Sequence, residues 1–320
     1  MDATNSHAAQ PDSITSRSFA GEQDLVAMLE MLMQARSRTH DWQYAHVGEL
    51  LFNFFMVASH LEPAAHIRLW HASQSHLVGY AILGEDPSFD WQVLPGYEWA
   101  GIEIEAYAWA EELLTDLRQR DPKQWDAALV SGSRQDNPNR IHFLEQHGFK
   151  YWGKFAEVNL LRSLGGPVPE PAIPPGYRVC SMVELADIDD RAAAHREVWL
   201  PWTVGNITQA DYARFMQLPG YHPDLDVVVL APGGMIASYV NGWIDPLNHI
   251  GDFGPVGARQ AYRRQGLTRL ALLESLRRMQ SCGMDRVCIS TGEDNTPALN
   301  LYTSIGFKVV NHYLDYLQAA

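Results

Sequence analysis

A basic turn near the C-terminus has the composition of an anion-binding site. Residues 263–268 read RRQGLT and lie between an expected strand and an expected helix. Backbone N–H groups at a helix start point outward with the positive end of the helix dipole behind them, and Gly266 lets a phosphate approach the backbone closely. Arg263 and Arg264 add positive charge within an acidic chain. The turn therefore predicts a phosphate site, although an exposed turn with two solvated arginines has the same short pattern.

A repeated segment carries a second candidate for chemistry. Residues 137–149 and 295–307 both follow an aspartate, begin with asparagine and end in Gly-Phe, and both precede lysine. One supersecondary unit is therefore used twice. The copies differ at one informative position, because the second has Tyr302 where the first has Leu144. A phenol can exchange a proton and a leucine cannot, so the sequence predicts that only the second copy is chemically active.

The first copy also lacks a phosphate turn. The corresponding segment, residues 97–105, reads YEWAGIEIE and has no arginine or lysine. The carboxylates of Glu98, Glu103 and Glu105 would repel a diphosphate. We expect the N-terminal half to keep the fold, to pack against the active half and to form part of the acceptor site, because binding sites commonly form between domains. Residual cofactor binding there stays open.

At these residues the chain resembles the GNAT superfamily of acyl-CoA-dependent N-acyltransferases. The family's phosphate loop, Q/R-x-x-G-x-G/A, is matched from Arg263 through Gly266 and departs from the pattern at Thr268. Its downstream motif, N-x-x-A-x-x-L-Y-x-x-x-G-F, is matched at Asn295, Ala298, Leu301, Tyr302, Gly306 and Phe307. The architecture of a degenerate first half and an active second half is similar to that of tandem GNAT proteins of the mycothiol synthase type.

The resemblance implies how acetyl-CoA, the co-substrate, would bind. A V-shaped opening between the fourth and fifth strands would admit the pantetheine arm, and the diphosphate would rest on the loop amides. Asn295 would fix a strand-to-helix turn and contact the cofactor arm, and Tyr302 would protonate the departing thiolate. The residues expected to hold the cofactor are Val256, Ala258, Arg263, Arg264, Gln265, Gly266, Leu267, Thr268 and Asn295.

An amine nucleophile must also lose a proton. Asp252 precedes the loop at a place where many family members have a glutamate, and His249 is the second candidate base. Asp252 in a turn with a solvated carboxylate, or a base acting through water, fits the same residues. Trp243 and Asp245 are candidates for the acceptor pocket, although most tryptophans are core residues.

Composition restricts the partners. The chain has 320 residues, which predicts two domains, and a formal net charge of -14. That charge disfavours nucleic acid and favours a cationic or amine-bearing small molecule. No apolar run reaches the roughly 18 residues of a membrane span, and residues 1–20 lack the features of a secretory signal, so we expect a cytoplasmic protein. Three cysteines without CxxC spacing predict packed thiols and no metal site.

The expected organisation is two tandem GNAT folds of α/β class, each an α+β mixed sheet. A mobile tail is expected at residues 1–20, a degenerate N-terminal domain at 21–164, a Pro/Gly linker at 165–176 and an active C-terminal domain at 177–320. Helices are expected at 22–38, 188–198, 209–217 and 268–282. Strands are expected at 67–71, 77–83, 127–130, 177–182, 226–230, 236–243, 249–258, 286–290 and 308–317, with a strand at 102–104 running into a helix that ends at 118.

These observations predict an acetyl-CoA-dependent N-acetyltransferase that acts by direct attack of a primary amine in the C-terminal domain. No covalent enzyme intermediate is expected, because correct orientation of amine and thioester can supply much of the rate enhancement. An acyl-CoA-binding sensor or scaffold without turnover is the alternative from another class. A sensor has no use for Tyr302, so that residue favours the enzyme.

Overall fold

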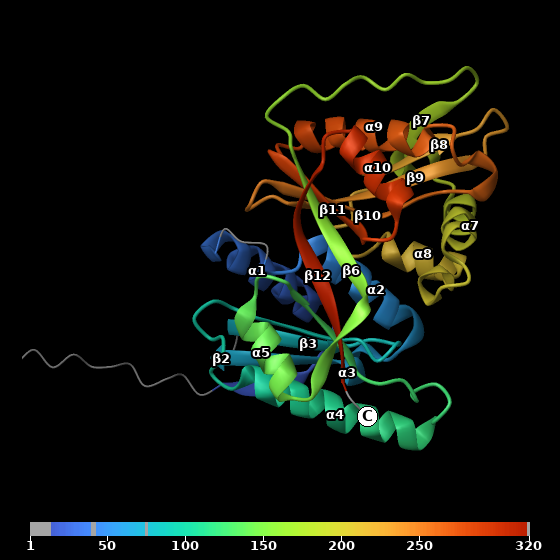
Figure 1. Ribbon diagram of the computed structural model, residues 1–320. Coiled ribbons are helices and arrows are strands. Elements are labelled where there is room, and N and C mark those ends of the chain that lie inside the picture. The colour runs from blue at the N-terminus through green and yellow to red at the C-terminus, as the bar shows by residue number, and fades with distance from the viewer. Residues whose placement is uncertain (1–13, 40–42, 74–75, 319–320) are drawn as a thin grey trace, which may run out of the picture.

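A computed structural model describes residues 14–318 of the chain, apart from 40–42 and 74–75. It has two α/β units, placed one above the other in Figure 1. The N-terminal half contains β1 (Thr15–Ser18), α1 (Glu22–Thr39), α2 (Val47–His60), α3 (Pro63–His66), β2 (Ile67–Ser73), β3 (His76–Leu83), β4 (Phe89–Val93), α4 (Ile102–Arg120), β5 (Val130–Arg134), α5 (Pro138–Gln146) and β6 (Phe149–Ser163). The C-terminal half contains β7 (Arg178–Ser181), α6 (Met182–Leu185), α7 (Ile188–Trp199), η1 (Thr203–Gly205), α8 (Gln209–Phe215), β8 (Asp226–Leu230), β9 (Ile236–Asp245), β10 (Ile250–Ala258), η2 (Gln260–Tyr262), α9 (Leu267–Ser281), β11 (Arg286–Gly292), α10 (Thr296–Ser304) and β12 (Lys308–Gln318).

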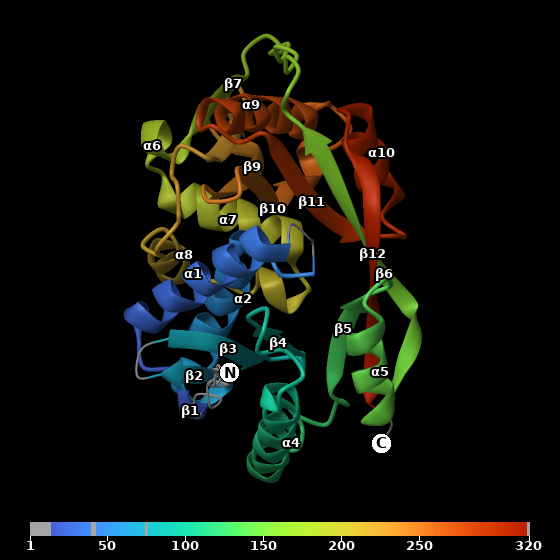
Figure 2. The same cartoon turned by 90° about the vertical axis from the view of Figure 1, so that its left-hand side faces the viewer.

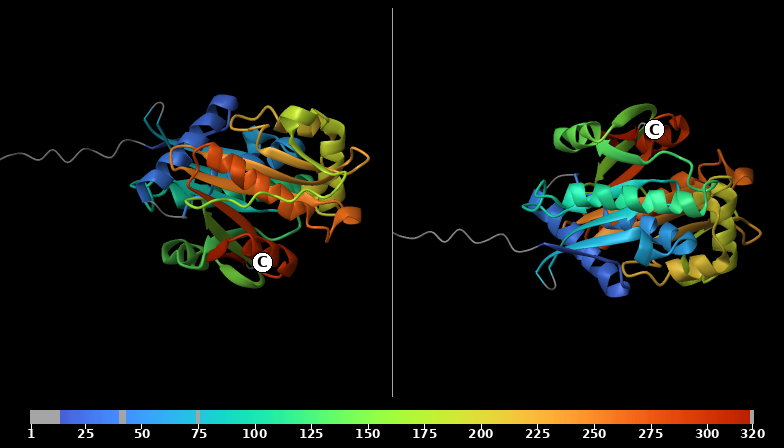
Figure 3. Two further views of the ribbon diagram at one scale, coloured as in Figure 1. Left: turned by 90° about the horizontal axis from the view of Figure 1, so that it is seen from above. Right: turned by 90° about the horizontal axis from the view of Figure 1, so that it is seen from below.

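The strands form two sheets. A four-stranded sheet has the order β1-β2-β3-β4, and an eight-stranded sheet has the order β5-β12-β6-β11-β10-β9-β8-β7. The pairing of β10 with β11 is parallel, whereas the neighbouring ladders are antiparallel. Helix α9 lies over the C-terminal strands and α4 lies across the underside of the N-terminal unit (Figure 3). This mixed α/β architecture is the predicted fold class.

The two halves exchange strands. The second part of β6, Glu157–Ser163, pairs with β11 of the C-terminal half. The second part of β12, Tyr313–Leu317, pairs with β5 of the N-terminal half. Strands β6 and β12 also pair with each other, and both run from one unit into the other (Figures 1 and 2). The predicted linker at residues 165–176 therefore divides the sequence into two halves that both contribute strands to the eight-stranded sheet.

Most elements that were predicted from periodicity are present near their expected positions, but two predictions are wrong. The strand expected at residues 127–130 begins only at Val130 and continues to Arg134 as β5. The alternating residues from 102 to 104 begin helix α4 instead of forming a strand. Gly101, with φ of 115°, precedes the helix, and the acidic side chains Glu103 and Glu105 lie in its first turn, where they complement the helix dipole. Residues 15–18, within the expected tail, form β1, and residues 1–13 lie outside the described part.

Helix α2 joins the two units and was not predicted. It lies between the four-stranded sheet and the C-terminal strands (Figure 2). Its Phe55 contacts Phe215 of α8, with ring centroids 4.7 Å apart. A Cβ atom on Gly48 would come within 2.4 Å of the Trp243 ring, so only glycine permits this close approach of α2 to β9. The core of the N-terminal unit thus continues into the C-terminal unit.

Candidate active site

The two central strands of the C-terminal unit separate beside the basic turn. Strands β10 and β11 pair from Ile250–Phe253 to Arg286–Ile289 and no further. Beyond Phe253 the register of β10 shifts, and Val256–Ala258 pair only with β9 among the described strands, while β11 continues along β6. The peptide groups of residues 256–258 thus face a gap, which is the opening that the family resemblance predicts.

The gap opens into a cavity of about 1450 Å³ that both units line. From the C-terminal unit come the strand ends, the basic turn and α10, and from the N-terminal unit come the start of α2 and residues of β4–α5. The predicted site residues on its wall are Asp252, Val256, Ala258, Arg263, Arg264, Gly266, Leu267, Thr268, Asn295 and Tyr302. Gln265 is absent from this described wall, and its side-chain oxygen accepts a hydrogen bond from Tyr177 at 2.9 Å.

The backbone of the basic turn has the geometry of an anion site. Arg264 and Gly266 have positive φ angles of 61° and 77°, and α9 begins immediately afterwards at Leu267. No described heavy atom lies within 4 Å of the position that a Cβ on Gly266 would occupy, so the backbone is open at this point. The N–H groups of a first helical turn have no partner within the helix. They are therefore free to bind an anion.

The side chains of the basic turn differ in how far they are available to a ligand. Arg263 donates from Nε to the Ala258 carbonyl at 3.1 Å, and Arg264 is exposed. Thr268 accepts a hydrogen bond at Oγ1 from Ser238 at 3.1 Å. The side chain of Leu267 is buried in the core, so this residue offers only its backbone. The hydroxyl at position 268 is thus held by β9, and the departure from the family pattern leaves the helix start intact.

The N-terminal unit has a similar turn before α4, but it carries different side chains. Trp99 has φ of 61° and Gly101 has φ of 115° immediately before α4. The carboxylate of Glu103, which is 3% exposed, accepts a hydrogen bond from the Trp99 N–H at 2.8 Å. Burial raises the pKa of Glu103, and its Oε2 atom has no hydrogen-bond partner among the described residues. A carboxylate from the first turn of α4 thus already binds the amide of Trp99.

The strand gap of the N-terminal unit is bridged by Arg140. Its guanidinium donates to the Gly132 carbonyl of β5 at 2.7 Å and to the Trp91 carbonyl of β4 at 2.9 Å. It also pairs with Asp90 at 2.6 Å and lies 3.7 Å from the Trp91 ring centroid. The peptide groups that a pantetheine arm would need between these strands therefore already have a partner.

Tyr302 presents its phenol to the cavity from α10. The side chain is 6% exposed and contacts Phe307, with ring centroids 6.2 Å apart. Burial raises the pKa of Tyr302, so the hydroxyl stays protonated at neutral pH. Within the described part of the chain it makes no hydrogen bond, which leaves it free to donate to a ligand. Its counterpart Leu144 is fully buried in the core of the N-terminal unit.

Asn295 caps α10 in the way that the resemblance implies. Its Oδ1 atom accepts from the Ala298 N–H at 3.4 Å, and its Nδ2 atom donates to Thr291 at 3.0 Å. The turn from β11 to α10 is thereby fixed beside the gap, and Tyr302 lies two helical turns further on, in the same wall.

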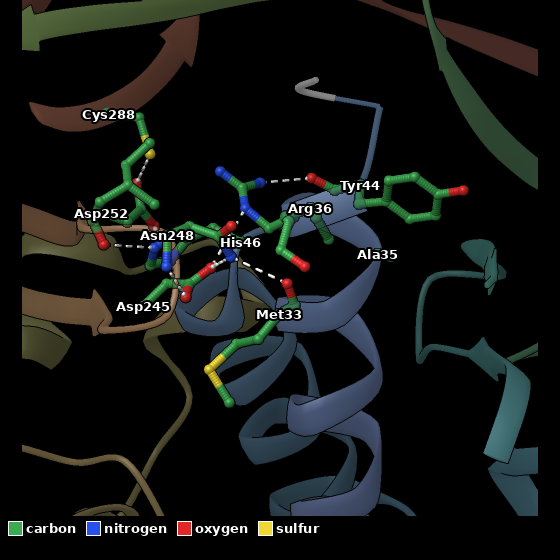
Figure 4. Close-up of polar contacts among 12 residues, drawn as sticks. Met33, Ala35, Arg36, Tyr44, His46, Asp245, Asn248, Asp252 and Cys288 are labelled. Atoms are coloured by element: carbon green, nitrogen blue, oxygen red, sulfur yellow. Dashed lines mark hydrogen bonds and ion pairs between the residues drawn. The ribbon is translucent and has the colours of Figure 1, made fainter. Parts of the chain in front are cut away.

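Asp252 lies on β10 and lines the cavity, and its side chain lies beside Cys288 (Figure 4). Its Oδ1 atom accepts a hydrogen bond from the thiol of Cys288 at 3.3 Å. Burial raises the pKa of Asp252 to about 6, although that hydrogen bond and the charge of Arg36 oppose the increase. A carboxylate with a pKa near neutrality can take a proton from an ammonium group and release it again.

His46 of the N-terminal unit approaches Asp252 but is not its ion-pair partner. Its Nδ1 atom accepts from the Gly48 N–H at 3.0 Å, and Nε2 faces the Ile250 carbonyl at 3.3 Å. This pattern places the ring proton on Nε2, and burial holds the pKa of His46 well below its usual range. The 3.9 Å distance from Nδ1 to Asp252 Oδ2 therefore joins a neutral ring and a carboxyl group.

The remaining sequence candidates lie outside the described cavity wall. His249 is exposed and contacts the Gly283 carbonyl at 3.2 Å through Nδ1. Trp243 is buried against α2 and donates to the Gly254 carbonyl at 2.6 Å. Asp245 is buried, 3.6 Å from Arg36, and accepts from Asn248 (Figure 4). Trp243 and Asp245 thus hold the two units together and are not part of the described cavity wall.

Two carboxylates of the cavity escaped sequence analysis. Glu49 on α2 and Glu157 on β6 both line it. The side chain of Glu49 is exposed to the cavity, but the protein that surrounds it raises its pKa to about 8, and the charges of Asp90, Glu157 and Asp252 reinforce the increase. Burial also raises the pKa of Glu157, which accepts from Ser290 at 2.9 Å. No local signal marks either residue, because each reaches the site only through packing between the units.

Comparison with known proteins identifies a family domain in the C-terminal half. Residues 191–307 match the family model described as the acetyltransferase (GNAT) family. The mycothiol acetyltransferase of Pseudarthrobacter chlorophenolicus is 23% identical over 245 residues, which cover 74% of this chain and 72% of that protein. The mycothiol acetyltransferase of Jonesia denitrificans is 29% identical over 194 residues, covering 57% and 60%.

Solved structures share the fold over nearly the whole chain. A GCN5-related N-acetyltransferase from Sphaerobacter thermophilus superposes with a TM-score of 0.63 at 21% identity, covering 96% of this chain and 95% of that one. A tandem GNAT protein from the clavulanic acid biosynthesis pathway gives 0.65 at 16% identity, covering 95% and 98%. No described helix has the length and apolarity to cross a membrane. The chain therefore contains a GNAT acetyltransferase domain at residues 191–307, within a tandem GNAT fold, and is an acyltransferase.

Proposed function

We propose that this enzyme transfers an acetyl group from acetyl-CoA to a primary amine by direct attack. The observation that carries the proposal is the common cavity, in which the strand gap, the basic turn, Tyr302 and Asp252 face one space. The name of the relatives, mycothiol acetyltransferase, supports a small-molecule acceptor.

The residues around the gap fit acetyl-CoA. Peptide groups of Val256 and Ala258 would pair with the pantetheine arm as a neighbouring strand would. The open backbone from Arg264 to Thr268 would bind the diphosphate with the help of the α9 dipole. The side chains of Arg263 and Arg264 would add charge, and Asn295 would hold the turn beside the arm.

The proton transfers balance with two residues. Asp252 takes one proton from the ammonium group of the acceptor, and the neutral nitrogen attacks the thioester carbonyl. As the C–S bond breaks, Tyr302 donates its proton to the leaving sulfur, and the phenolate regains a proton from the new amide nitrogen. Asp252 then releases its proton to water. The products are the acetylated amine, the free thiol and one proton.

We further propose that only the C-terminal unit binds the cofactor. In the N-terminal unit Glu103 occupies the amide where a diphosphate oxygen would bind, and Arg140 bridges the strands where pantetheine would enter. The carboxylate also adds negative charge at the position of the ligand. Both replacements support the loss of acyl-CoA binding from this half.

A coupled assay tests the proposal. The purified chain is incubated with acetyl-CoA and a panel of primary amines, free thiol release is followed, and the acetylated product is identified by mass spectrometry. We expect thiol release that depends on one class of amine. Failure of every amine to accelerate release, together with no binding of acetyl-CoA by calorimetry, would overturn the proposal.

A further inference from the structure

Glu49 reaches the active cavity from the N-terminal unit on a firmly held helix. It lies in the first turn of α2, directly after Gly48, which packs against Trp243. The cap residue His46 is tied to the β10 backbone through Ile250. The side chain of Glu49 is accessible to the cavity, on the same wall as Asp252. Its position is therefore fixed by the contact between the two units.

The carboxylates around Glu49 have partners, whereas Glu49 has no hydrogen-bond or ion-pair partner among the side chains that the structure describes. Asp90 pairs with Arg140 at 2.6 Å, Glu157 accepts from Ser290 at 2.9 Å, and Asp252 accepts from Cys288 at 3.3 Å. No hydrogen bond or ion pair to Glu49 exists among residues 14–318 outside the two gaps. The charged groups that act on it come from four elements, namely Asp90 of β4, Glu157 of β6, Asp252 of β10 and Arg36 of α1.

Aromatic side chains of the same cavity also favour a cation. Phe52, in the next turn of α2, lines the wall with Trp202, which lies between α7 and η1 and is 64% exposed. The face of an aromatic ring attracts a positively charged group, and tryptophan does so most strongly. Both rings line the cavity that Glu49 faces, so its lining is compatible with a cationic ligand.

We propose that Glu49 determines acceptor specificity by binding the ammonium group of the acceptor beside Asp252. The inference rests on the proposed function and gives its acceptor a chemical class, an aliphatic primary amine that is protonated at neutral pH. The charge of a bound ammonium group favours the ionised form of Glu49 and opposes the surroundings that raise its pKa. Glu49 then holds the cation while Asp252 takes the proton, so the nitrogen becomes a nucleophile only at the end of the gap. Alcohols and uncharged arylamines lack the group that Glu49 binds.

The test compares n-butylammonium with 1-butanol, which have similar shapes and differ in charge. Their binding to the full chain is measured by ligand-observed NMR at pH 9, without acetyl-CoA. An alkyl ammonium resembles the lysine side chain and stays protonated at this pH. We expect wild-type protein to prefer the ammonium by about 10- to 100-fold, the range for a hydrogen bond to a charged group. Glu49→Gln keeps the shape of the side chain and should abolish the preference.

A surface variant serves as the control. Glu30→Gln removes the same charge from an exposed position of α1 outside the described cavity wall and should leave the preference unchanged. A preference that survives Glu49→Gln, or its absence from wild-type protein, would overturn the inference. Acetyl-CoA affinity should be equal in all three proteins. A preference that depends on Glu49 without acetylation of any amine would retain the cation site and reject the proposed reaction.

Discussion

Trp99 and Arg264 have the same positive φ of 61°, and each lies two residues before a glycine that starts a helix. The turn has therefore survived in both halves although its side chains have diverged. At the position of Thr268 the N-terminal unit has Glu103, whose carboxylate binds the Trp99 amide. Both units thus keep the backbone of the turn, but in the N-terminal unit a carboxylate of the protein already binds one of its amides.

Cofactor stoichiometry follows from this difference. Calorimetric titration of the full chain should give one acetyl-CoA per chain. In the N-terminal unit, Glu103 and Arg140 already bind the backbone groups that correspond to the proposed cofactor contacts. Two sites of comparable affinity would contradict the assignment of the N-terminal turn.

Gly266→Ala should weaken acetyl-CoA binding by more than about tenfold. A side chain at this positive φ costs about 1 to 2 kcal/mol of conformational energy and places a methyl group where the phosphate approaches. Gly234→Ala is a matched control, because Gly234 has φ of 86°, equally open surroundings and a place in the β8–β9 hairpin away from the cavity. Both variants should lose similar stability, and only the first should lose affinity in calorimetry. Equal affinities would place the diphosphate elsewhere.

Tyr302→Phe should lower kcat by roughly 100-fold while the dissociation constant of acetyl-CoA holds. The change removes the hydroxyl that protonates the leaving sulfur and little else, and 100-fold is at the lower end for general acid catalysis. Steady-state kinetics and cofactor titration of one preparation distinguish the effects. Turnover near that of wild type would remove the phenol from the chemical step.

Leu144→Ala provides the contrasting change in the other copy. It deletes a fully buried side chain and should reduce the free energy of unfolding by about 2 to 5 kcal/mol. Thermal or denaturant unfolding measures the loss. The kcat of the folded fraction should equal that of wild type, and a selective loss of turnover would give the N-terminal repeat a chemical role.

Asp252→Asn should have opposite effects on activity and stability. Wild-type kcat/KM should rise as the pH increases through about 6, where Asp252 becomes a base, and the variant should lose this limb. The folded pKa lies above the ordinary value of 3.8, so protonation favours the folded state. That contribution is complete below pH 3.8 and is lost as the pH rises through about 6. The variant should therefore be more stable than wild type at pH 8, by about 1 to 3 kcal/mol, and not at pH 4. Equal free energies of unfolding of the two proteins at pH 8 would argue against a raised pKa of Asp252 in the folded state.

Sequence reasoning reached those features that local pattern determines. Helix α9, the glycine at its start and the asparagine cap of α10 follow from periodicity and motif spacing within one stretch of chain. The alternation of apolar and acidic residues at 102–104 predicted a strand, but the preceding glycine and the acidic first turn favour the helix that is found there.

Helix α2 was missed although its sequence carries a signal, because apolar residues such as Leu50, Leu51 and Phe54 recur at helical spacing and are buried. The other features that sequence reasoning missed depend on contacts between the halves. Glu49 becomes a site residue only when Gly48 packs on Trp243. The exchange of β6 and β12 likewise depends on pairing between the halves and cannot be read from either strand alone.

The exchanged strands make each half incomplete without the other. A chain cut off at residue 164 would lack the part of β12 that covers β5, and the separated C-terminal half would lack the part of β6 that lies between β11 and β12. Each fragment would expose strand edges that invite aggregation. Cleavage within residues 165–176, by contrast, breaks no ladder of either sheet, so the two pieces should remain joined as one particle. The duplicated chain thus behaves as one folding unit, because each half supplies a strand that completes the sheet of the other.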